Sequence, residues 1–552
     1  MDHLANNPGQ MRLISFVNKV TAVHVSLIGA VVSLILGFAK VLSPNTLFGE
    51  PGTNLAYDQG VYFGAALRIT KGALPYRDFT LVHPPGILAL LQPEALVGRF
   101  IGTGAGLALA QIVTVFVVAA NAFLAGYLVR SSGRTASLVG SLALSLWPFA
   151  VHVDALVELE PYLVLFTFLG LLFVTSAKKA TLNRSLFLGG LALGVAMSVK
   201  VWGFYPFIGL GLVLIFQHRK AALAYFFGTA SAMAIFWLPP LILSPSAFLH
   251  DVVISQLHRQ GFIGTSPTPL VSRFLTTAGL GDIFYGSLIS TSVVLVTLLF
   301  SIFLLGLVLT FGLRGKNRSS TEWAILATCM TTALGVLTMH APNYTSHYAY
   351  VPAAALAPLL GFLVAKVVQR LNQTLIGESL GQLPTRFLAG GVALLVLGVG
   401  VFFFVPQIQR VNAAEYASSF RVVSDLKDAI PENSCAVSDF PNDLIASDRY
   451  LSSKPNCSIL TDPFGMYLAN DFGNQPHVFS PEHPISPAFS AKWQKELSRI
   501  DVLVESVPFS SYFPWDPQIM EWFAKHFTLT NTFTYDTPSG IPFHRYVYVR
   551  NP

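Results

Sequence analysis

Residues 50–86 read EPGTNLAYDQGVYFGAALRITKGALPYRDFTLVHPPG and follow the first long apolar segment of the chain. The stretch is polar where its surroundings are apolar. Its charged side chains and its histidine are Glu50, Asp58, Arg68, Lys71, Arg77, Asp78 and His83. Ionisable groups next to hydrocarbon are costly and usually functional. We interpret this stretch as part of the first external loop of a membrane protein, residues 43–102, with Asp58 as a candidate catalytic base.

The composition of the 552 residues excludes an ordinary soluble domain. Hydrophobic residues make up 53% of the chain and charged residues only 11%, with a mean hydropathy of +0.58. A soluble domain carries about 25% charged residues. The chain is therefore predicted to be a polytopic protein of the lipid bilayer. Its basic residues stand in short groups between apolar spans, as in cytoplasmic loops, so no nucleic-acid partner is expected.

The apolar spans predict about eleven transmembrane helices, since each crossing needs about 20 residues. They lie at 20–42, 104–129, 135–151, 159–176, 185–201, 203–217, 222–243, 287–313, 322–340, 349–368 and 387–405. The first span is too long for a signal peptide and lacks a small-residue cleavage site, so we expect it to be retained.

The placement of Lys and Arg gives the orientation. Connections rich in these residues alternate with longer or less basic ones, which places the N-terminus in the cytoplasm of a plasma-membrane protein. An odd number of spans then leaves residues 407–552 outside. This part holds 11 Lys and Arg against 16 Asp and Glu, whereas residues 1–406 hold 23 against 12. We therefore expect a transmembrane domain, 1–406, and an extracytoplasmic domain, 407–552.

The external domain is predicted to be α/β, because strand-like and helical patterns alternate in it. Strands are expected at 435–440, 458–461, 501–505, 527–535 and 545–550, and helices at 412–430, 442–451, 488–499 and 516–526. Cys435 and Cys457 stand 22 positions apart in it. An oxidising compartment would allow them to form a disulfide, and two free thiols are the alternative.

Carboxylates gather on the predicted outer face. Asp154, Glu158 and Glu160 lie within seven positions in one short external connection. Carboxylates suit the N-terminus of a helix, but three exceed what a cap needs, so one is expected to bind substrate or metal. Asp58 also stands at a predicted helix start, where an N-cap is the structural alternative to a catalytic role.

Basic and aromatic residues supply the complementary groups. His83 precedes Pro84 at a predicted helix start, where free N–H groups favour an anion, so it could contact a phosphate or simply pack at an interface. Lys200 either anchors the chain at the membrane surface or binds a phosphate. His347 and Tyr348 lie in an external connection that is dense in hydrogen-bonding aromatics, which favours a binding role.

Several pieces of sequence together resemble a known superfamily. They are YDQGVY at 57–62, PYRDF at 75–79, HPPG at 83–86, Glu160-Pro161, Lys200 and His347-Tyr348. In their order and in the side of the membrane on which they are predicted to lie, these pieces resemble the GT-C superfamily of integral membrane glycosyltransferases. Within that superfamily the chain is most similar to the protein-O-mannosyltransferase (family 39) and aminoarabinose-transferase-like branch. Two positions depart from that pattern. Gln59 stands where many relatives carry a second carboxylate, and His83 stands where the aminoarabinose branch often has Lys.

The resemblance implies an inverting transfer of a sugar from a polyprenyl-phosphate donor to a hydroxyl acceptor of the cell envelope, on the outer face. Mannose or arabinofuranose is the implied sugar, and the acceptor is a glycan, glycolipid or protein. Asp58 would be the base. The donor phosphate would be bound by His83, Lys200, Arg77 and His347. Substrate would also contact Tyr62, Asp154, Glu158, Glu160 and Tyr348. No cofactor is required, although Asp58, Asp154 and Glu158 could share a divalent cation.

Other functions stay open. A transporter or flippase of lipid-linked sugars would place charges at mid-membrane on broken helices in repeated halves. This chain shows no repeat and places its charges at the outer ends of the spans, which disfavours transport. A non-catalytic envelope-assembly protein, with the external domain as its interaction module, remains an alternative. So does a glycosidase with paired carboxylates.

Overall fold

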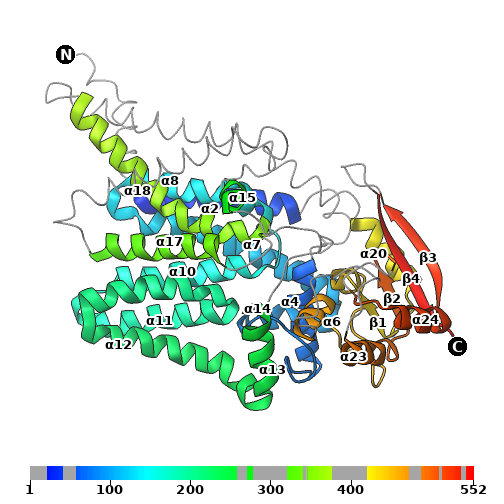
Figure 1. Ribbon diagram of the computed structural model, residues 1–552. Coiled ribbons are helices and arrows are strands. Elements are labelled where there is room, and N and C mark those ends of the chain that lie inside the picture. The colour runs from blue at the N-terminus through cyan, green and yellow to red at the C-terminus, as the bar shows by residue number, and fades with distance from the viewer. Residues whose placement is uncertain are drawn as a thin grey trace, which may run out of the picture.

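The computed structural model describes a helical bundle and a C-terminal α/β part, which lie end to end (Figure 1). The described residues are 21–41, 57–257, 270–277, 320–339, 344, 346–375, 419–470, 486–508, 513–535 and 542–552. We call residues 419–552 the tail.

Long apolar helices build the bundle. Within the described residues, six helices are long and apolar enough to cross a membrane. They are α2 (Ala22–Val41), α7 (Thr103–Leu128), α11 (Leu182–Val199), α12 (Phe204–Leu243), α17 (Ser320–Thr338) and α18 (Tyr350–Leu375). Shorter helices pack among them: α8 (Arg134–Ser145), α9 (Pro148–Val153) and α10 (Leu159–Thr175). The predicted spans 287–313 and 387–405 lie outside the described residues.

Two of the predicted spans need a closer description. The span predicted at 135–151 is divided into α8 and α9, because Pro148 starts a new helix after Trp147. Helix α12 consists of two arms that meet at His218, whose backbone is not helical. The arms fold back on each other, since the Phe207 and Tyr225 rings stack at 5.5 Å. These arms correspond to the separate spans predicted at 203–217 and 222–243.

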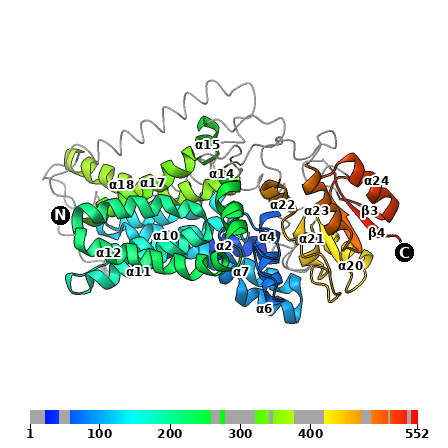
Figure 2. The same ribbon diagram turned by 60° about the horizontal axis from the view of Figure 1, so that its bottom comes forward.

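Short helices at one end of the bundle lie next to the tail (Figure 2). The segment between α2 and α7 supplies α4 (Tyr57–Thr70), α5 (Gly86–Leu90) and α6 (Gln92–Ile101). The chain after α12 adds α13 (Pro245–Leu249), a π-helical turn at His250–Ile254, α14 (Ser255–Leu257) and α15 (Leu270–Thr277). The 3-10 turns there are η3 (Val201–Gly203) and η7 (Ser346–Ala349). Helix α4 is buried from Gln59 to Arg68 without a break, so it lies inside the protein rather than at its surface.

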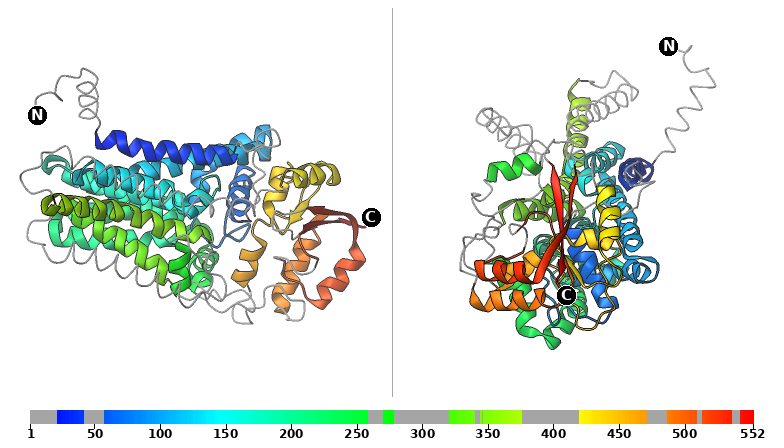
Figure 3. Two further views of the ribbon diagram at one scale, coloured as in Figure 1. Left: turned by 90° about the horizontal axis from the view of Figure 1, so that it is seen from above. Right: turned by 90° about the vertical axis from the view of Figure 1, so that its right-hand side faces the viewer.

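The tail contains a four-stranded sheet of order β1-β2-β4-β3. Its strands are β1 (Ala436–Ser438), β2 (Val502–Glu505), β3 (Phe527–Tyr535) and β4 (Phe543–Arg550). The β1–β2 pair is parallel and the other two pairs are antiparallel. Its helices are α20 (Ser419–Ala429), α21 (Pro441–Ala446), α22 (Pro463–Asn470), α23 (Pro487–Leu497) and α24 (Pro517–His526). Figure 3 shows the β3–β4 pair in the part of the tail that lies farthest from the bundle.

The tail agrees with most of its predicted elements. Four of the five expected strands and the four expected helices form, with shifted ends. The segment 458–461 is not a strand, and α22 was not predicted. Cys435 and Cys457 form the predicted disulfide, which excludes the alternative of two free thiols. An aromatic core that includes Trp493 and Phe523 fills the space between the sheet and α23 and α24.

Candidate active site

Three potential metal-ligating groups converge where α4 meets the bundle. Asp58 lies in the first turn of α4, Glu158 directly precedes α10, and His347 lies in η7. The Nε2 atom of His347 is 3.5 Å from Oδ2 of Asp58. One ligand atom from each of the three residues lies within 4.8 Å of the others. The side chain of Asp58 is 34% exposed, so solvent or substrate can reach it.

A buried ion pair lies beside this cluster. Lys200 Nζ donates a hydrogen bond to Oε1 of Glu160, and both residues are buried. The same Nζ lies 3.6 Å from the centre of the Trp202 ring and 4.4 Å from that of Tyr348. The two aromatic faces and the carboxylate thus surround this nitrogen in a site removed from water.

Turn η7 joins the two groups. Its consecutive residues His347 and Tyr348 contact Asp58 and Lys200, respectively. Tyr62, one helical turn after Asp58, packs its ring against His83 at 5.6 Å between centroids. Burial, followed by the negative charges of Asp58 and the nearby glutamates, raises the pKa of the Tyr62 phenol. Tyr62 is therefore a neutral hydroxyl group between the carboxylates and His83.

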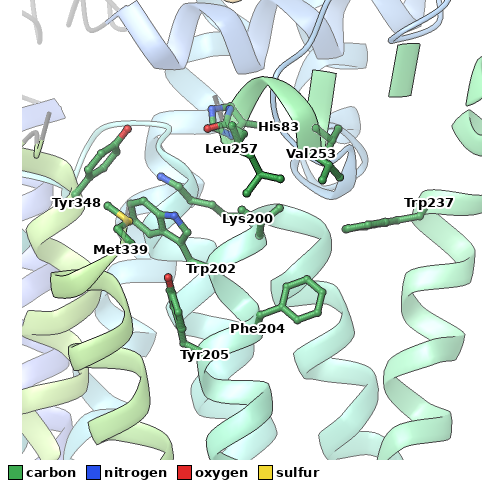
Figure 4. Close-up of a pocket in the computed structure, with 13 residues that line it drawn as sticks. His83, Lys200, Trp202, Phe204, Tyr205, Trp237, Val253, Leu257, Met339 and Tyr348 are labelled. Atoms are coloured by element: carbon green, nitrogen blue, oxygen red, sulfur yellow. The ribbon is translucent and has the colours of Figure 1, made fainter. Parts of the chain in front are cut away.

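A cavity of about 450 Å³ opens next to Lys200 (Figure 4). Figure 4 shows the Lys200 side chain between Trp202, Tyr348 and His83, with Phe204, Tyr205 and Trp237 on the further walls. The cavity therefore has a cationic end and apolar, aromatic walls. Such a shape suits an anion that carries a hydrophobic chain.

A close helix contact brings His83 and Lys200 to the same cavity. Gly86 starts α5 against the end of α11, where a Cβ on it would lie 2.5 Å from the carbonyl oxygen of Ser198. Only a glycine permits this approach without a shift of the backbone. The loop before α5 is held from the other side, because the Tyr76 hydroxyl donates to the His83 carbonyl at 2.6 Å.

Two predicted site residues do not join these groups. Arg77 forms a 2.6 Å ion pair with its neighbour Asp78 and lines a separate cleft of about 160 Å³ together with Lys492. Its position does not support a role in binding the donor phosphate at the cavity. Asp154 is buried, and burial raises its pKa to about 7, opposed by the charge of Lys40. In the three-residue cluster His347 occupies the place that the sequence-based hypothesis gave to Asp154.

The remaining predicted residues lie where they can act together: Asp58, Tyr62, His83, Glu158, Glu160, Lys200, His347 and Tyr348. Sequence reasoning missed the structural role of Gln59. Its Oε1 accepts hydrogen bonds from Gln111 at 3.2 Å and from the N–H of Val157 at 3.3 Å. Gln59 thus ties α4 to the residue preceding Glu158, and Glu158 supplies the second carboxylate. Trp237 at the cavity carried no sequence signal beyond its being aromatic.

Structural comparison identifies the fold. ArnT from Cupriavidus metallidurans, solved with undecaprenyl phosphate bound, superposes with a TM-score of 0.54 at 13% identity, covering 94% of this chain and 97% of that one. The Archaeoglobus fulgidus oligosaccharyltransferase gives 0.54 at 14% identity, covering 97% and 75%. The chain has the GT-C fold. A further structure of the archaeal enzyme, AglB with an inhibitory peptide and a dolichol-phosphate, also gives 0.54 at 13% identity, covering 95% and 74%. No family model and no curated protein sequence matches the chain.

Proposed function

We propose that this protein is an inverting glycosyltransferase of the plasma membrane that moves a sugar from a polyprenyl-phosphate donor to a hydroxyl group of the cell envelope, on the outer face. The proposal rests on the position of turn η7. Its two consecutive residues bring an accessible carboxylate, Asp58, and a buried ammonium group, Lys200, to one site. A base and a cation on opposite sides of a reacting carbon are what a displacement with an anionic leaving group needs.

The reaction follows from these positions. Asp58 accepts the proton of the acceptor hydroxyl, and the oxygen of that hydroxyl forms a bond to the anomeric carbon. The bond from that carbon to the donor phosphate breaks, and the electron pair leaves with the phosphate. Lys200 and His83 stabilise the developing negative charge at the cavity. A single displacement inverts the anomeric centre, and Tyr62 and Glu158 are placed to orient the sugar.

The cavity supports a lipid donor. Its walls beyond Lys200 are aromatic and aliphatic, so an isoprenoid chain can occupy them while the phosphate faces the cation. ArnT and AglB, which have the same fold, have been solved with undecaprenyl phosphate and dolichol-phosphate. We extend this lipid class to the present chain. The sugar is proposed to be mannose or arabinofuranose, and the acceptor a glycan, glycolipid or protein.

A divalent cation is a second possibility for the same cluster. Two carboxylates and one imidazole, from Asp58, Glu158 and His347, form a donor set that suits a transition-metal ion. Such a cation would supply positive charge to the phosphate, but by drawing electron density from the carboxylate it would lower the basicity that Asp58 needs as a base. Dialysis against a chelator separates the two roles. Loss of transfer that added Mn²⁺ restores would assign the cluster to metal binding, whereas unchanged transfer supports the free base.

The proposal is tested by incubating the purified protein with polyprenyl-phosphate sugars and extracted envelope acceptors. Asp58→Asn keeps the size of the side chain and removes the base, so transfer is expected to fall about 10²- to 10⁴-fold. Asp78→Asn, in the same loop but in the separate cleft, serves as the matched control and is expected to retain transfer. Full transfer by Asp58→Asn would overturn the base assignment. Absence of transfer by the wild type would overturn the proposed function.

A further inference from the structure

Helix α4 has a second face that turns away from the cavity. Asp58 and Tyr62, one turn apart, contact His347 and His83. The positions 57, 60, 64 and 68 follow helical spacing along another side of the same helix. All four contact the tail, so the tail packs on the helix that carries the proposed base.

The contacts along this face are close. A Cβ on Gly60 would lie 2.6 Å from the backbone nitrogen of Asn442, at the start of α21. A Cβ on Gly64 would lie 2.5 Å from the hydroxyl of Tyr450. The guanidinium carbon of Arg68 lies 4.4 Å from the centre of the same Tyr450 ring. Glycine at two of the four positions lets α21 and Tyr450, which follows α21, approach the backbone of α4.

Tyr57 makes the polar contacts of this face. Its hydroxyl donates to Oδ1 of Asp462 at 2.6 Å and accepts from the N–H of Phe464 at 3.1 Å. It therefore completes the N-terminus of α22, whose N–H groups need partners. The Tyr57 ring also packs edge-on against Phe440 at 5.9 Å. Because Tyr57 directly precedes Asp58, these contacts fix the end of α4 from which the base projects.

A second contact holds Phe440. The Arg545 guanidinium lies 5.0 Å from the Phe440 ring centre and pairs with the fully buried carboxylate of Asp443. A buried bidentate pair of this kind is rigid, because breaking it leaves an uncompensated charge. A continuous series of contacts therefore runs from strand β4 through Phe440 and Tyr57 to Asp58.

From these contacts we infer that the tail positions the base, and that Tyr57 is the positioning residue. The inference rests on the proposed function in that Asp58 is taken as the base. It assigns the tail a role in the chemical step, beyond covering the site or binding an acceptor. Tyr57 does not touch substrate in this arrangement; it acts by holding the first turn of α4.

Tyr57→Phe tests this role, because it removes both hydrogen bonds of the hydroxyl and keeps the ring against Phe440. The expected result is a fall in kcat of about tenfold, the scale of a lost hydrogen bond to a charged group. KM for the donor should stay near its wild-type value, because Lys200 and the cavity are unaffected. Asp462→Ala, which removes the acceptor of the Tyr57 hydroxyl, should lower kcat similarly. The double variant should be little worse than either single variant, because the two changes remove one shared contact.

Tyr535→Phe is the matched control. The Tyr535 hydroxyl donates to Asp425 at 2.8 Å, and both residues belong to the tail. The substitution removes the same kind of tyrosine–aspartate bond without touching α4. It is expected to lower the melting temperature about as much as Tyr57→Phe does, with kcat unchanged. An equal loss of kcat in both variants would show a general destabilisation of the tail and overturn the inference.

Hydrogen–deuterium exchange gives a readout that does not depend on transfer. Tyr57→Phe should speed exchange in peptides covering 57–70, and Tyr535→Phe should not. Unchanged exchange there, or unchanged kcat in Tyr57→Phe, would contradict the positioning role. If wild-type protein transfers no sugar while the exchange of 57–70 still responds to Tyr57→Phe alone, the docking of α4 stands and the proposed function fails.

Discussion

Lys200 and Glu160 form an ion pair that is almost fully removed from solvent, since their side chains are 5% and 1% exposed. Among the residues that the structure describes, Oε2 of Glu160 has no hydrogen-bond partner. A buried pair adds little net stability, because desolvation offsets the attraction between the charges. The pair is therefore better explained by the cation that it presents to the cavity than by a contribution to folding.

Lys200→Gln is expected to lower transfer about 10²-fold, because the leaving phosphate loses its cation. It should also lower the free energy of unfolding by about 3 kcal/mol, because Glu160 becomes an uncompensated buried charge. The double variant that also carries Glu160→Gln should regain the lost stability but should not recover the lost transfer. Thermal unfolding and transfer rates, measured on the same preparations, check both effects. Recovery of transfer in the double variant would show that Lys200 only supports the fold.

Asp439 makes the stability of the tail depend on pH. Burial raises the pKa of its carboxyl from 3.8 to about 6, opposed by Arg545 and by hydrogen bonds from Ser506. Between these two pH values the folded protein holds a proton that the unfolded chain has lost. The free energy of unfolding must therefore fall by on the order of 3 kcal/mol as pH rises from about 4 to about 6. Above about pH 6 it stays level. Asp439→Asn should reduce this fall in melting temperature, and an unchanged pH profile would contradict the assignment.

At the scale of elements, α4 is a helix that contacts both the candidate site and the tail. Its contacts differ by face, and a single residue can disturb one face and leave the others. Gly60 and Gly64 are the points of closest approach to the tail.

The variant Gly60→Ala distinguishes the effect of packing on stability from the effect of helix propensity. Propensity alone predicts that alanine stabilises α4 by up to about 1 kcal/mol. The new Cβ would meet a backbone atom of Asn442 that cannot move alone, so we expect a net destabilisation of about 1–3 kcal/mol. Gly64→Ala should cost less, because it meets the end of the Tyr450 side chain. Melting temperatures of the two variants check the order, and a more stable Gly60→Ala would contradict the docking geometry.

Elements with a strong local pattern were predictable from the sequence. The apolar spans and the strands at β2 and β3 needed no knowledge of distant contacts. Helix α22 was missed because Gly465 in its first turn weakens the pattern, and its start is completed by Tyr57 from a remote part of the chain. The segment 458–461 has strand-like residues, but no described strand pairs with it.

The candidate site was predictable by residue type rather than by distance. Carboxylates at helix starts, such as Asp58 and Glu158, were visible in the sequence. Their convergence with His347 depends on packing between helices far apart in the chain. Arg77 was assigned to the donor phosphate, but it forms an ion pair with its neighbour Asp78. The spacing of residues in the sequence does not indicate this pairing.

At the scale of the whole molecule, the tail packs on α4 and on the start of α7. The orientation in the membrane decides which side the site faces. The basic connections predict that the tail lies outside and that the connection between α10 and α11 lies in the cytoplasm. Lys179 lies in that connection, and Lys525 is exposed in α24.

Cysteine substitution tests this orientation. In intact cells a membrane-impermeant maleimide should label Lys525→Cys and should label Lys179→Cys only after the membrane is permeabilised. The native Cys435 and Cys457 are joined in a disulfide and Cys329 is buried, so the background should be low. The opposite labelling pattern would place the cavity on the cytoplasmic side and exclude an external reaction.

The hydrogen bond between Tyr57 and Asp462 joins residues that are 405 positions apart. The ribosome therefore makes α4 long before it makes the partner of Tyr57. Arg545, whose guanidinium contacts the Phe440 ring, is made later still, in β4. The contacts between α4 and the tail can therefore form only after the residues of the tail that make them have been synthesised. Until then Asp58 lacks the contacts that we infer to hold it, so a partly synthesised chain is expected not to transfer sugar.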